Sequence, residues 1–298
     1  MTINELNQKY AIAGQLDFRH GQGNLPTAFI KNKFATAEIS IYGAHVLKYQ
    51  PITQKDVLWM SSDSCFEEGK PIRGGIPVCF PWFGPHVNDS SKPQHGFARL
   101  LTWSVISAKG LSNGATELLL ELDSNSYTRQ LWLCEFRAQV KIEVGPSLEV
   151  TLSYHNTGNQ SFVCSDALHT YFNISHVDNI KISGLQGTTY YKGFEKEASG
   201  KQTERYLQIQ QEENRRYTGH ASECIIEDSG FNRKVHVSKK GSNVTVVWNP
   251  WESARNITDM PDDGYKTMVC VEAVNAYDDV VTVESGQSFS ISTKIWVE

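Results

Sequence analysis

One carboxylate within an apolar segment is the first residue of this chain whose surroundings suggest chemistry. Glu272 lies in Met-Val-Cys-Val-Glu-Ala-Val, residues 268–274, where its neighbours on both sides are apolar. A buried carboxylate is costly unless it is paired or used, and burial raises its pKa toward the range that a general base needs. The alternatives are a glutamate paired with an arginine, or one that faces solvent on an edge strand. We favour the general base.

A single histidine is the natural partner for such a base. His169 lies in Ser-Asp-Ala-Leu-His-Thr-Tyr-Phe, residues 165–172, a run typical of a strand. From residue types alone, a histidine there is more often a hydrogen-bonded core residue than a catalyst. The sequence has no His-Glu-x-x-His, no Cys/His cluster, no glycine loop for phosphate and no Gly-x-Ser-x-Gly elbow. With metal, nucleotide and nucleophile motifs missing, a lone His and Glu indicate plain acid–base chemistry.

The loop of residues 72–99 offers groups that could bind a sugar. It begins with Arg73 on a glycine pair, ends with Gln94, His95, Gly96 and Arg99, and carries Phe and Trp side chains between prolines and glycines. So many prolines and glycines exclude a regular helix or a central strand. Aromatic faces can cover the C–H faces of a sugar, and guanidinium groups can bind hydroxyls or a phosphate. The structural alternative is a rigid loop whose aromatic rings close one end of a core.

The elements that would position these residues are short strands. Residues 136–144 alternate apolar and polar side chains, and residues 148–154 repeat the pattern after Gly-Pro-Ser, which predicts an antiparallel hairpin. Further strands are predicted at residues 34–42, 44–49, 57–60, 101–106, 116–122, 180–183, 224–227, 234–238, 244–248, 268–273 and 289–297. Only residues 251–260 look helical, ending before Pro261. The fold class is therefore all-β, a large antiparallel β-sandwich, in one domain over residues 1–298.

Composition narrows the class of protein. A net charge of −5 and a pI near 6.0 argue against nucleic acid or an anionic membrane as partner. No apolar run approaches the roughly 20 residues of a membrane helix, and the N-terminus lacks the features of a signal peptide. The six cysteines are scattered without a Cys-x-x-Cys pair, as expected for reduced thiols. We expect a soluble, cytoplasmic protein.

Five segments together resemble the D-hexose-6-phosphate mutarotases, the glucose-6-phosphate 1-epimerase branch of the aldose 1-epimerase family. The resemblance spans about residues 20–298 and follows the family's order. Its motifs are Gly-Gly-Ile-Pro-Val-Cys-Phe-Pro-Trp-Phe-Gly-Pro, Gln-His-Gly-Phe-Ala-Arg, Ala-Leu-His-Thr-Tyr-Phe, Val-Trp-Asn-Pro-Trp and Met-Val-Cys-Val-Glu-Ala. The resemblance implies a single-domain β-supersandwich with a sugar cleft on one sheet. The acid–base chemistry needs no cofactor, the missing motifs argue against a metal, and we expect a monomer.

The resemblance also implies roles for single residues. His169 matches the family's general acid and Glu272 its general base. The substrate-binding residues that it implies are Arg73, Gln94, His95, Arg99, Asn214 and Trp248. Among these, Arg99 is the first candidate for a phosphate contact and Arg73 the second.

One position departs from the family's pattern. The family usually carries Asp-Arg-x-Tyr, whose aspartate binds a sugar hydroxyl, whereas this chain reads Asn-Arg-Arg-Tyr from Asn214 to Tyr217. Asparagine still accepts a hydrogen bond but carries no negative charge.

The expected reaction is interconversion of the α and β anomers of a hexose 6-phosphate. Two other interpretations stay open: a non-catalytic carbohydrate-binding sandwich, and a mutarotase for unphosphorylated aldoses. A tuned acid–base pair separates the enzyme from the binding protein, and the arginines separate a phosphorylated from a free sugar.

Overall fold

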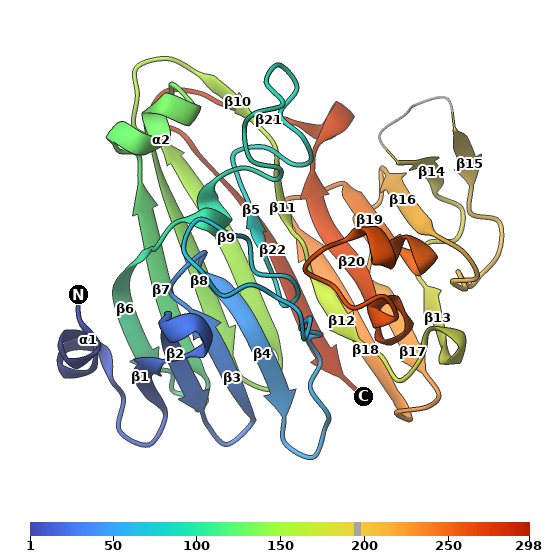
Figure 1. Ribbon diagram of the computed structural model, residues 1–298, viewed down its shortest axis with the longest axis horizontal. Coiled ribbons are helices and arrows are strands. Elements are labelled where there is room, and N and C mark those ends of the chain that lie inside the picture. The colour runs from blue at the N-terminus through green and yellow to red at the C-terminus, as the bar shows by residue number, and fades with distance from the viewer. Residues whose placement is uncertain (194–197) are drawn as a thin grey trace.

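The structure is a computed structural model that describes residues 1–193 and 198–298, and every pairing among its named strands is antiparallel (Figure 1). Two eight-stranded sheets dominate it, joined by a four-stranded and a two-stranded sheet. The predicted all-β antiparallel sandwich is confirmed.

The first large sheet contains the predicted hairpin. Its order is β13 (Ile180–Ser183), β17 (Cys224–Asp228), β18 (Arg233–Lys240), β22 (Ser288–Val297), β9 (Leu148–Asn156), β8 (Phe136–Val144), β7 (Thr116–Asp123) and β6 (Ser104–Gly110). In β8 the side chains alternate between buried and partly or fully exposed, as the period of two predicts.

The second large sheet carries the candidate site, and we call it the site sheet. Its order is β15 (Ser199–Lys201), β14 (Thr189–Lys192), β16 (Glu213–Thr218), β19 (Val244–Asn249), β20 (Met268–Asn275), β11 (Asp166–Leu168) and β5 (Val78–Cys79), with β12 (Tyr171–Asn173) also paired to β20. Every residue of β20 is buried, because it lies between neighbours in the sheet and is covered on both faces.

Two smaller sheets complete the layers. The four-stranded sheet runs β1 (Leu16–His20), β2 (Pro26–Lys31), β3 (Ala35–Ser40) and β4 (His45–Pro51), and the two-stranded sheet pairs β10 (Phe162–Cys164) with β21 (Val281–Val283).

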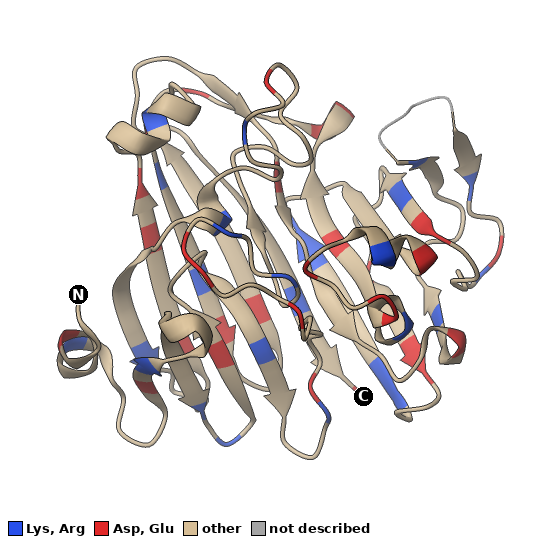
Figure 2. Ribbon diagram, viewed as in Figure 1, with Lys and Arg blue, Asp and Glu red and all other residues tan. Residues whose placement is uncertain are grey.

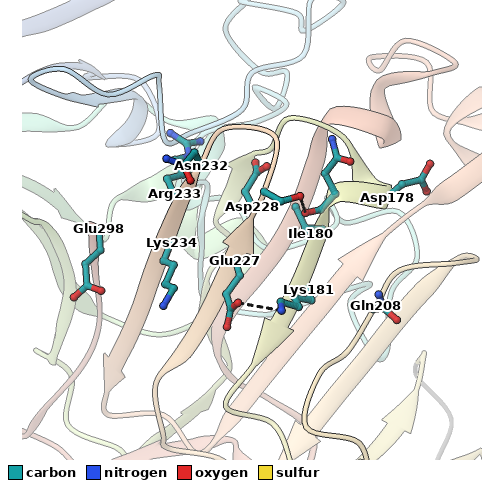
Figure 3. A pocket seen from close by; sticks show the side chains of 12 residues that line it. Asp178, Ile180, Lys181, Gln208, Glu227, Asp228, Asn232, Arg233, Lys234 and Glu298 are labelled. Carbon is teal, nitrogen blue, oxygen red and sulfur yellow. Dashed lines mark hydrogen bonds and ion pairs between the residues drawn. The ribbon is translucent and has the colours of Figure 1, made fainter.

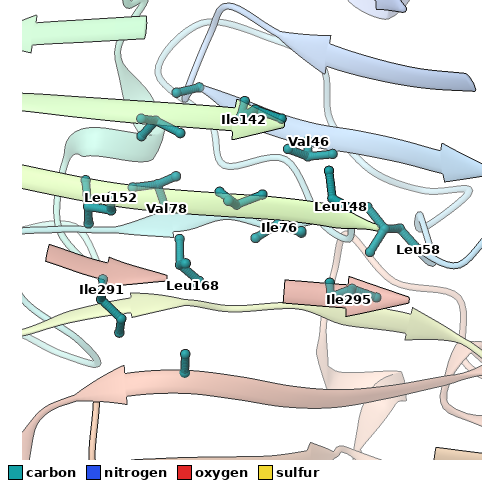
Figure 4. Close-up of a cluster of buried hydrophobic side chains, with 14 of the residues drawn as sticks. Val46, Leu58, Ile76, Val78, Ile142, Leu148, Leu152, Leu168, Ile291 and Ile295 are labelled. Atoms are coloured by element: carbon teal, nitrogen blue, oxygen red, sulfur yellow. The ribbon is translucent and has the colours of Figure 1, made fainter. Parts of the chain in front are cut away.

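The main core lies between the first large sheet and the layer formed by the site sheet and the four-stranded sheet. Figure 4 shows aliphatic side chains from both sides meeting there. Ile142, Leu148 and Ile291 come from one layer, and Val46 and Leu168 come from the other. Since side chains alternate along a strand, the neighbours of Leu168 point away from this core, toward the opposite face of the site sheet.

Helices are few and short, and two of them were not predicted. These are α1 (Ile3–Tyr10) and α2 (Ser126–Leu131), each with a capping box at its start. The signal for α1 was present in the sequence as Thr2 followed by Glu5. The other helices are 3₁₀ turns: η1 (Gln22–Asn24), η2 (Ala98–Leu100), η3 (Val177–Asn179), η4 (Trp251–Asn256), η5 (Gly264–Thr267) and η6 (Tyr277–Asp279).

Three predicted elements need correction. The helix predicted for residues 251–260 is only the 3₁₀ turn η4, because the chain becomes extended at Ile257, and Ile257 and Met260 then pack near Trp59. Residues 57–60 make two isolated bridges, Leu58 to Phe172 and Met60 to Gly74, instead of a strand. The strand predicted at residues 101–106 begins later, at Ser104, and runs to Gly110.

The distribution of charged residues and the state of the cysteines agree with the expectations from composition. Figure 2 shows that acidic and basic residues are interspersed along the ribbon. All six cysteines are free, and four of them are buried. No helix in the described part of the chain is long and apolar enough to span a membrane.

Candidate active site

Strand register places three of the predicted site residues, Asn214, Trp248 and Glu272, on one face of the site sheet. Asn214 pairs with Trp248, Trp248 pairs with Cys270, and Cys270 pairs with Tyr171. Directly paired residues of an antiparallel sheet point to the same side, and so do residues two apart on one strand. Glu272 therefore shares this face with Trp248 and Asn214, opposite the main core.

The predicted acid and base meet on this face. His169 lies at the break between β11 and β12, and its Nδ1 is 3.5 Å from Oε1 of Glu272 on β20. The side chains are 10% and 1% exposed, respectively. Nδ1 of His169 and Oε2 of Glu272 are both buried without a hydrogen-bond partner in the described structure. Buried polar atoms are nearly always satisfied in native proteins, so two unsatisfied atoms on adjacent groups indicate a functional constraint.

Burial shifts both groups away from their charged forms. It raises the pKa of Glu272 well above its ordinary value. It also lowers the pKa of His169 well below 6.5, and the nearby His95, Arg73 and Arg99 lower that pKa further. Burial therefore favours a neutral pair, with the proton on the carboxyl group.

The loop of residues 72–99 packs against this pair, and its backbone is irregular as predicted. Between Phe80 and Phe97 it contains no strand or helix. Its shape depends on glycine: Gly96 has a φ of +73°, and a Cβ there would lie 2.1 Å from the carbonyl oxygen of Phe80. The peptide bond between Phe80 and Pro81 is cis.

His95 reaches the acid–base pair from the end of this loop. Its ring centroid lies 5.5 Å from that of His169. The backbone N–H of Gly84 donates to its Nδ1 at 3.2 Å, which places the ring proton on Nε2. Burial lowers the pKa of His95 to about 3, and the charges of Arg99 and Arg73 act in the same direction. His95 is thus a neutral hydrogen-bond donor at any working pH.

Arg73 is held at the edge of the cluster by two partners. Its Nε donates to Asp259 at 3.0 Å, and its NH1 donates to the Tyr171 hydroxyl at 3.0 Å. The Arg73 side chain remains 23% exposed.

Arg99 differs because it is buried without a counter-ion. It is 9% exposed and donates to the backbone carbonyl of Gln94 at 2.8 Å, while its Nε has no partner. No carboxylate in residues 1–193 and 198–298 lies within ion-pair distance of it. Burial lowers its pKa, as expected for a cation that lacks a partner.

Three predicted substrate-binding residues lie farther from the acid–base pair: Trp248, Asn214 and Gln94. Trp248 meets the ring of His169 edge-on at 6.1 Å. Asn214 lies two strands from β20 on the same face, and its backbone carbonyl accepts from Gly193. Gln94 is exposed, and its recorded hydrogen bond is made by the backbone carbonyl, so a contact from its side chain stays a prediction.

Two residues of the cluster were missed from the sequence. Tyr171 stacks on His169 with ring centroids 4.8 Å apart and an angle of 8° between the planes. Its spacing of two from His169 in a predicted strand was an available signal. Asp259, the partner of Arg73, lies 186 positions away along the chain, and no local pattern marks it.

Tertiary structure also gathers three potential metal ligands that the sequence spacing did not suggest. Ligand atoms of His169, Cys270 and Glu272 lie within 4.8 Å of one another. Burial raises the pKa of the Cys270 thiol well above 9, so the thiolate that a metal needs is strongly disfavoured. The expectation of a metal-free site stays a prediction.

One pocket away from these residues has a volume of about 620 Å³ and opens beside β13, β17 and β18 (Figure 3). Lys181 and Glu227 pair across it at 3.3 Å, and it contains none of the residues described above.

A buried carboxyl and an imidazole on one face of an antiparallel sandwich, bordered by two arginines, define an acid–base site on a β-sandwich scaffold. A model of the family described as aldose 1-epimerase matches residues 27–296, and the chain belongs to this family. It is 36% identical over 241 residues to a protein of Salmonella typhimurium that carries the provisional name glucose-6-phosphate 1-epimerase, covering 80% of each chain. A protein of Escherichia coli with the same provisional name is 34% identical over 241 residues, again with 80% of each chain covered.

A solved structure gives the same result. A crystal structure provisionally described as a mutarotase from Salmonella typhimurium superimposes with a TM-score of 0.89 at 31% identity, covering 99% of this chain and 98% of the other. The family expected from the sequence is confirmed, and the chain is an epimerase by family membership.

Proposed function

We propose that this protein interconverts the α and β anomers of a hexose 6-phosphate by acid–base opening and closing of the sugar ring. The observation that carries the proposal is the contact between His169 and Glu272. Each buried side chain presents an unsatisfied atom, and the two groups lie 3.5 Å apart.

The two groups supply what the reaction needs. Glu272 takes the proton from the C1 hydroxyl while His169 donates one to the ring oxygen, and the C1–O5 bond breaks to give the open-chain aldehyde. Rotation about C1–C2 exposes the other face of the carbonyl. On closure O5 attacks C1, His169 recovers its proton and Glu272 returns a proton to O1. Each transfer contributes on the order of 10²–10⁴-fold, and no cofactor enters the scheme.

The proton must change its position before ring opening. Burial favours the neutral pair, whereas the scheme starts from a carboxylate and an imidazolium. The short distance from Oε1 of Glu272 to Nδ1 of His169 offers a direct path between the two states. Bound sugar stabilises the charged state, because its C1 hydroxyl donates to the carboxylate and its ring oxygen accepts from the imidazolium.

Two arginines support a phosphorylated substrate. Arg99 is a buried guanidinium with no carboxylate beside it in the described chain, and a phosphate dianion would supply the missing charge. Arg73 is the second candidate, because part of its side chain faces solvent although Asp259 already pairs with it. The provisional names of the Salmonella and E. coli relatives agree with this choice of substrate.

The remaining residues fit contacts to the sugar ring. The Nε2–H of His95 donates to a sugar oxygen, and the edge of Trp248 borders the apolar side of the ring. Asn214 offers an amide where the family usually has a carboxylate, and Gln94 completes the set.

The deciding experiment is anomer exchange measured by NMR on glucose 6-phosphate, free glucose and free galactose. The isosteric Glu272→Gln and His169→Asn variants are expected to lose at least about 10²-fold in kcat while retaining sugar binding. His236→Asn is a matched control, because His236 and His169 are each 8% exposed as whole residues, but His236 lies on β18. Its exchange rate should match that of the unmodified protein.

The outcomes separate the competing interpretations. Acceleration confined to the phosphorylated sugar, and lost in both site variants, supports the proposal. Equal acceleration of free sugars identifies a general aldose mutarotase. Sugar binding without acceleration identifies a carbohydrate-binding protein and makes Asn214 the first position to restore to aspartate.

We also propose that residues 1–298 form one mutarotase-like domain, since a single core cluster includes residues from Leu6 to Ile295. The monomeric state, the cytoplasmic location and the lack of nucleic-acid and membrane partners stay predictions from the sequence.

A further inference from the structure

The imidazole of His169 lacks the hydrogen bond that usually orients a catalytic histidine. Its Nδ1 has no hydrogen-bond partner in the described structure, and Oε1 of Glu272 lies 3.5 Å from it. A functional imidazole is normally held by a hydrogen bond from the nitrogen that does not react. Something else must therefore fix the plane of this ring.

Aromatic packing supplies the missing constraint. Tyr171 lies parallel to His169 at 4.8 Å with an angle of 8°, while Trp248 and His95 meet it edge-on at 6.1 and 5.5 Å. The parallel contact sets the plane of the ring, and the edge contacts limit its sliding. Stacked aromatic pairs are stabilising beyond the area that they bury.

Tyr171 is itself held on two sides. Its ring also stacks on that of Trp59, with centroids 6.0 Å apart and an angle of 18°, and its hydroxyl accepts from NH1 of Arg73 at 3.0 Å. The residue is 2% exposed. Arg73 is in turn fixed by Asp259. One tyrosine thus connects a candidate substrate-binding arginine to the candidate acid.

We propose that Tyr171 is a positioning residue that acts through its two neighbours: its ring holds the imidazole of His169 in the plane needed for proton transfer, and its hydroxyl fixes the Arg73 guanidinium. This inference rests on the proposed function, since it assigns His169 and Arg73 their roles. It assigns separate roles to the ring and to the hydroxyl of Tyr171. The ring governs the chemical step, and the hydroxyl governs substrate binding.

Two variants test this division. Tyr171→Phe keeps the stacked ring and removes the acceptor for Arg73, so kcat should stay within about threefold while KM for the hexose 6-phosphate rises about three- to tenfold. Tyr171→Leu removes the stack as well, and kcat should fall about 10- to 100-fold because small displacements of a reacting group have large effects. A higher kcat in Tyr171→Phe than in Tyr171→Leu would show that the aromatic ring, and not the hydroxyl, supports the chemical step.

A spectroscopic measurement reads the ring position without turnover. The Tyr171 ring shifts the NMR signals of the His169 ring protons, which are assigned by their loss in His169→Asn. That shift should persist in Tyr171→Phe and vanish in Tyr171→Leu. Tyr49→Phe is the matched control: Tyr49 is fully buried and donates to the carbonyl of Gly145 at 3.2 Å, away from the site. It should leave kcat, KM and the His169 signals unchanged.

Several results would overturn the inference. A folded Tyr171→Leu protein with unchanged kcat would show that the stack is dispensable, and a Tyr171→Phe protein as slow as the leucine variant would assign the effect to the hydroxyl. If Tyr171→Leu does not fold, Tyr171→Phe decides alone, and a tenfold loss of kcat in it refutes the division. If the unmodified protein does not accelerate anomer exchange, the proposed function fails. The NMR shift then still shows whether Tyr171 holds the His169 ring.

Discussion

Replacing Asp166 by asparagine should remove a pH-dependent loss of stability. Asp166 is fully buried at the start of β11, where Oδ2 accepts from the Tyr154 hydroxyl at 2.5 Å and Oδ1 accepts from the amide of Asn275 at 3.1 Å. Burial raises the pKa of this carboxyl from 3.8 to about 7, against the opposing effect of these two hydrogen bonds. The folded protein therefore retains a proton that the unfolded chain releases.

The sign and size of the effect follow from this difference. Below pH 3.8 both states hold the proton, and between pH 3.8 and about 7 only the folded state does. Stability therefore falls as pH rises through this window, and above about pH 7 the loss is complete. At about 1.36 kcal/mol per pKa unit, the loss is on the order of 4 kcal/mol.

The assay is urea unfolding of the unmodified protein and Asp166→Asn at pH 5, 6, 7 and 8. The difference between the two free energies of unfolding cancels other titrating groups, and it should move by about 2–4 kcal/mol in favour of asparagine as pH rises from 5 to 8. Asparagine can accept from Asn275 and donate to the Tyr154 oxygen, so the network survives. A difference that stays constant across this range would refute the reasoning.

Three further predictions concern the site and its loop. The pH profile of kcat should be flat through neutrality. Burial raises the pKa of Glu272 and lowers that of His169, so the two groups together hold one proton on both sides of pH 6.5. An inflection of kcat near pH 6.5 would contradict this. Arg99→Met should raise KM for glucose 6-phosphate at least tenfold while leaving KM for free glucose unchanged. The urea midpoint should stay the same or rise, since the substitution removes a buried charge that no carboxylate of the described residues pairs with. Equal losses on both sugars would argue against a phosphate contact. Gly96→Ala should lower the unfolding midpoint and slow anomer exchange, because the added Cβ would lie 2.1 Å from the carbonyl oxygen of Phe80. Gly286→Ala is the control, since Gly286 has a similar φ but open space around it, and this variant should slow exchange little.

Local patterns were sufficient for much of the fold. The alternation in residues 136–144 and 148–154 identified β8 and β9, because one face of each strand is buried and the other is wet. Glu272 stood out because a carboxylate in an apolar strand is unusual wherever the strand packs. The failures were equally local. Residues 251–260 have a helical composition, but the packing of Ile257 and Met260 with Trp59 limits the helix to a six-residue 3₁₀ segment.

The sequence by itself determined the strand periodicity, the rigid loop and the residue types of the site, since each follows from short-range sterics and the burial of apolar side chains. Only the tertiary structure decided which of them meet. Asp259 and Arg73 are 186 positions apart, and the 3.5 Å contact of His169 with Glu272 exists because β11, β12 and β20 pair in one register. It also decided that Arg99 is buried with no carboxylate from the described residues at ion-pair distance, and that Tyr171 stacks on the imidazole. Strand pairing and burial are properties of the folded chain. The pattern within one segment does not determine which distant segment will pack against it.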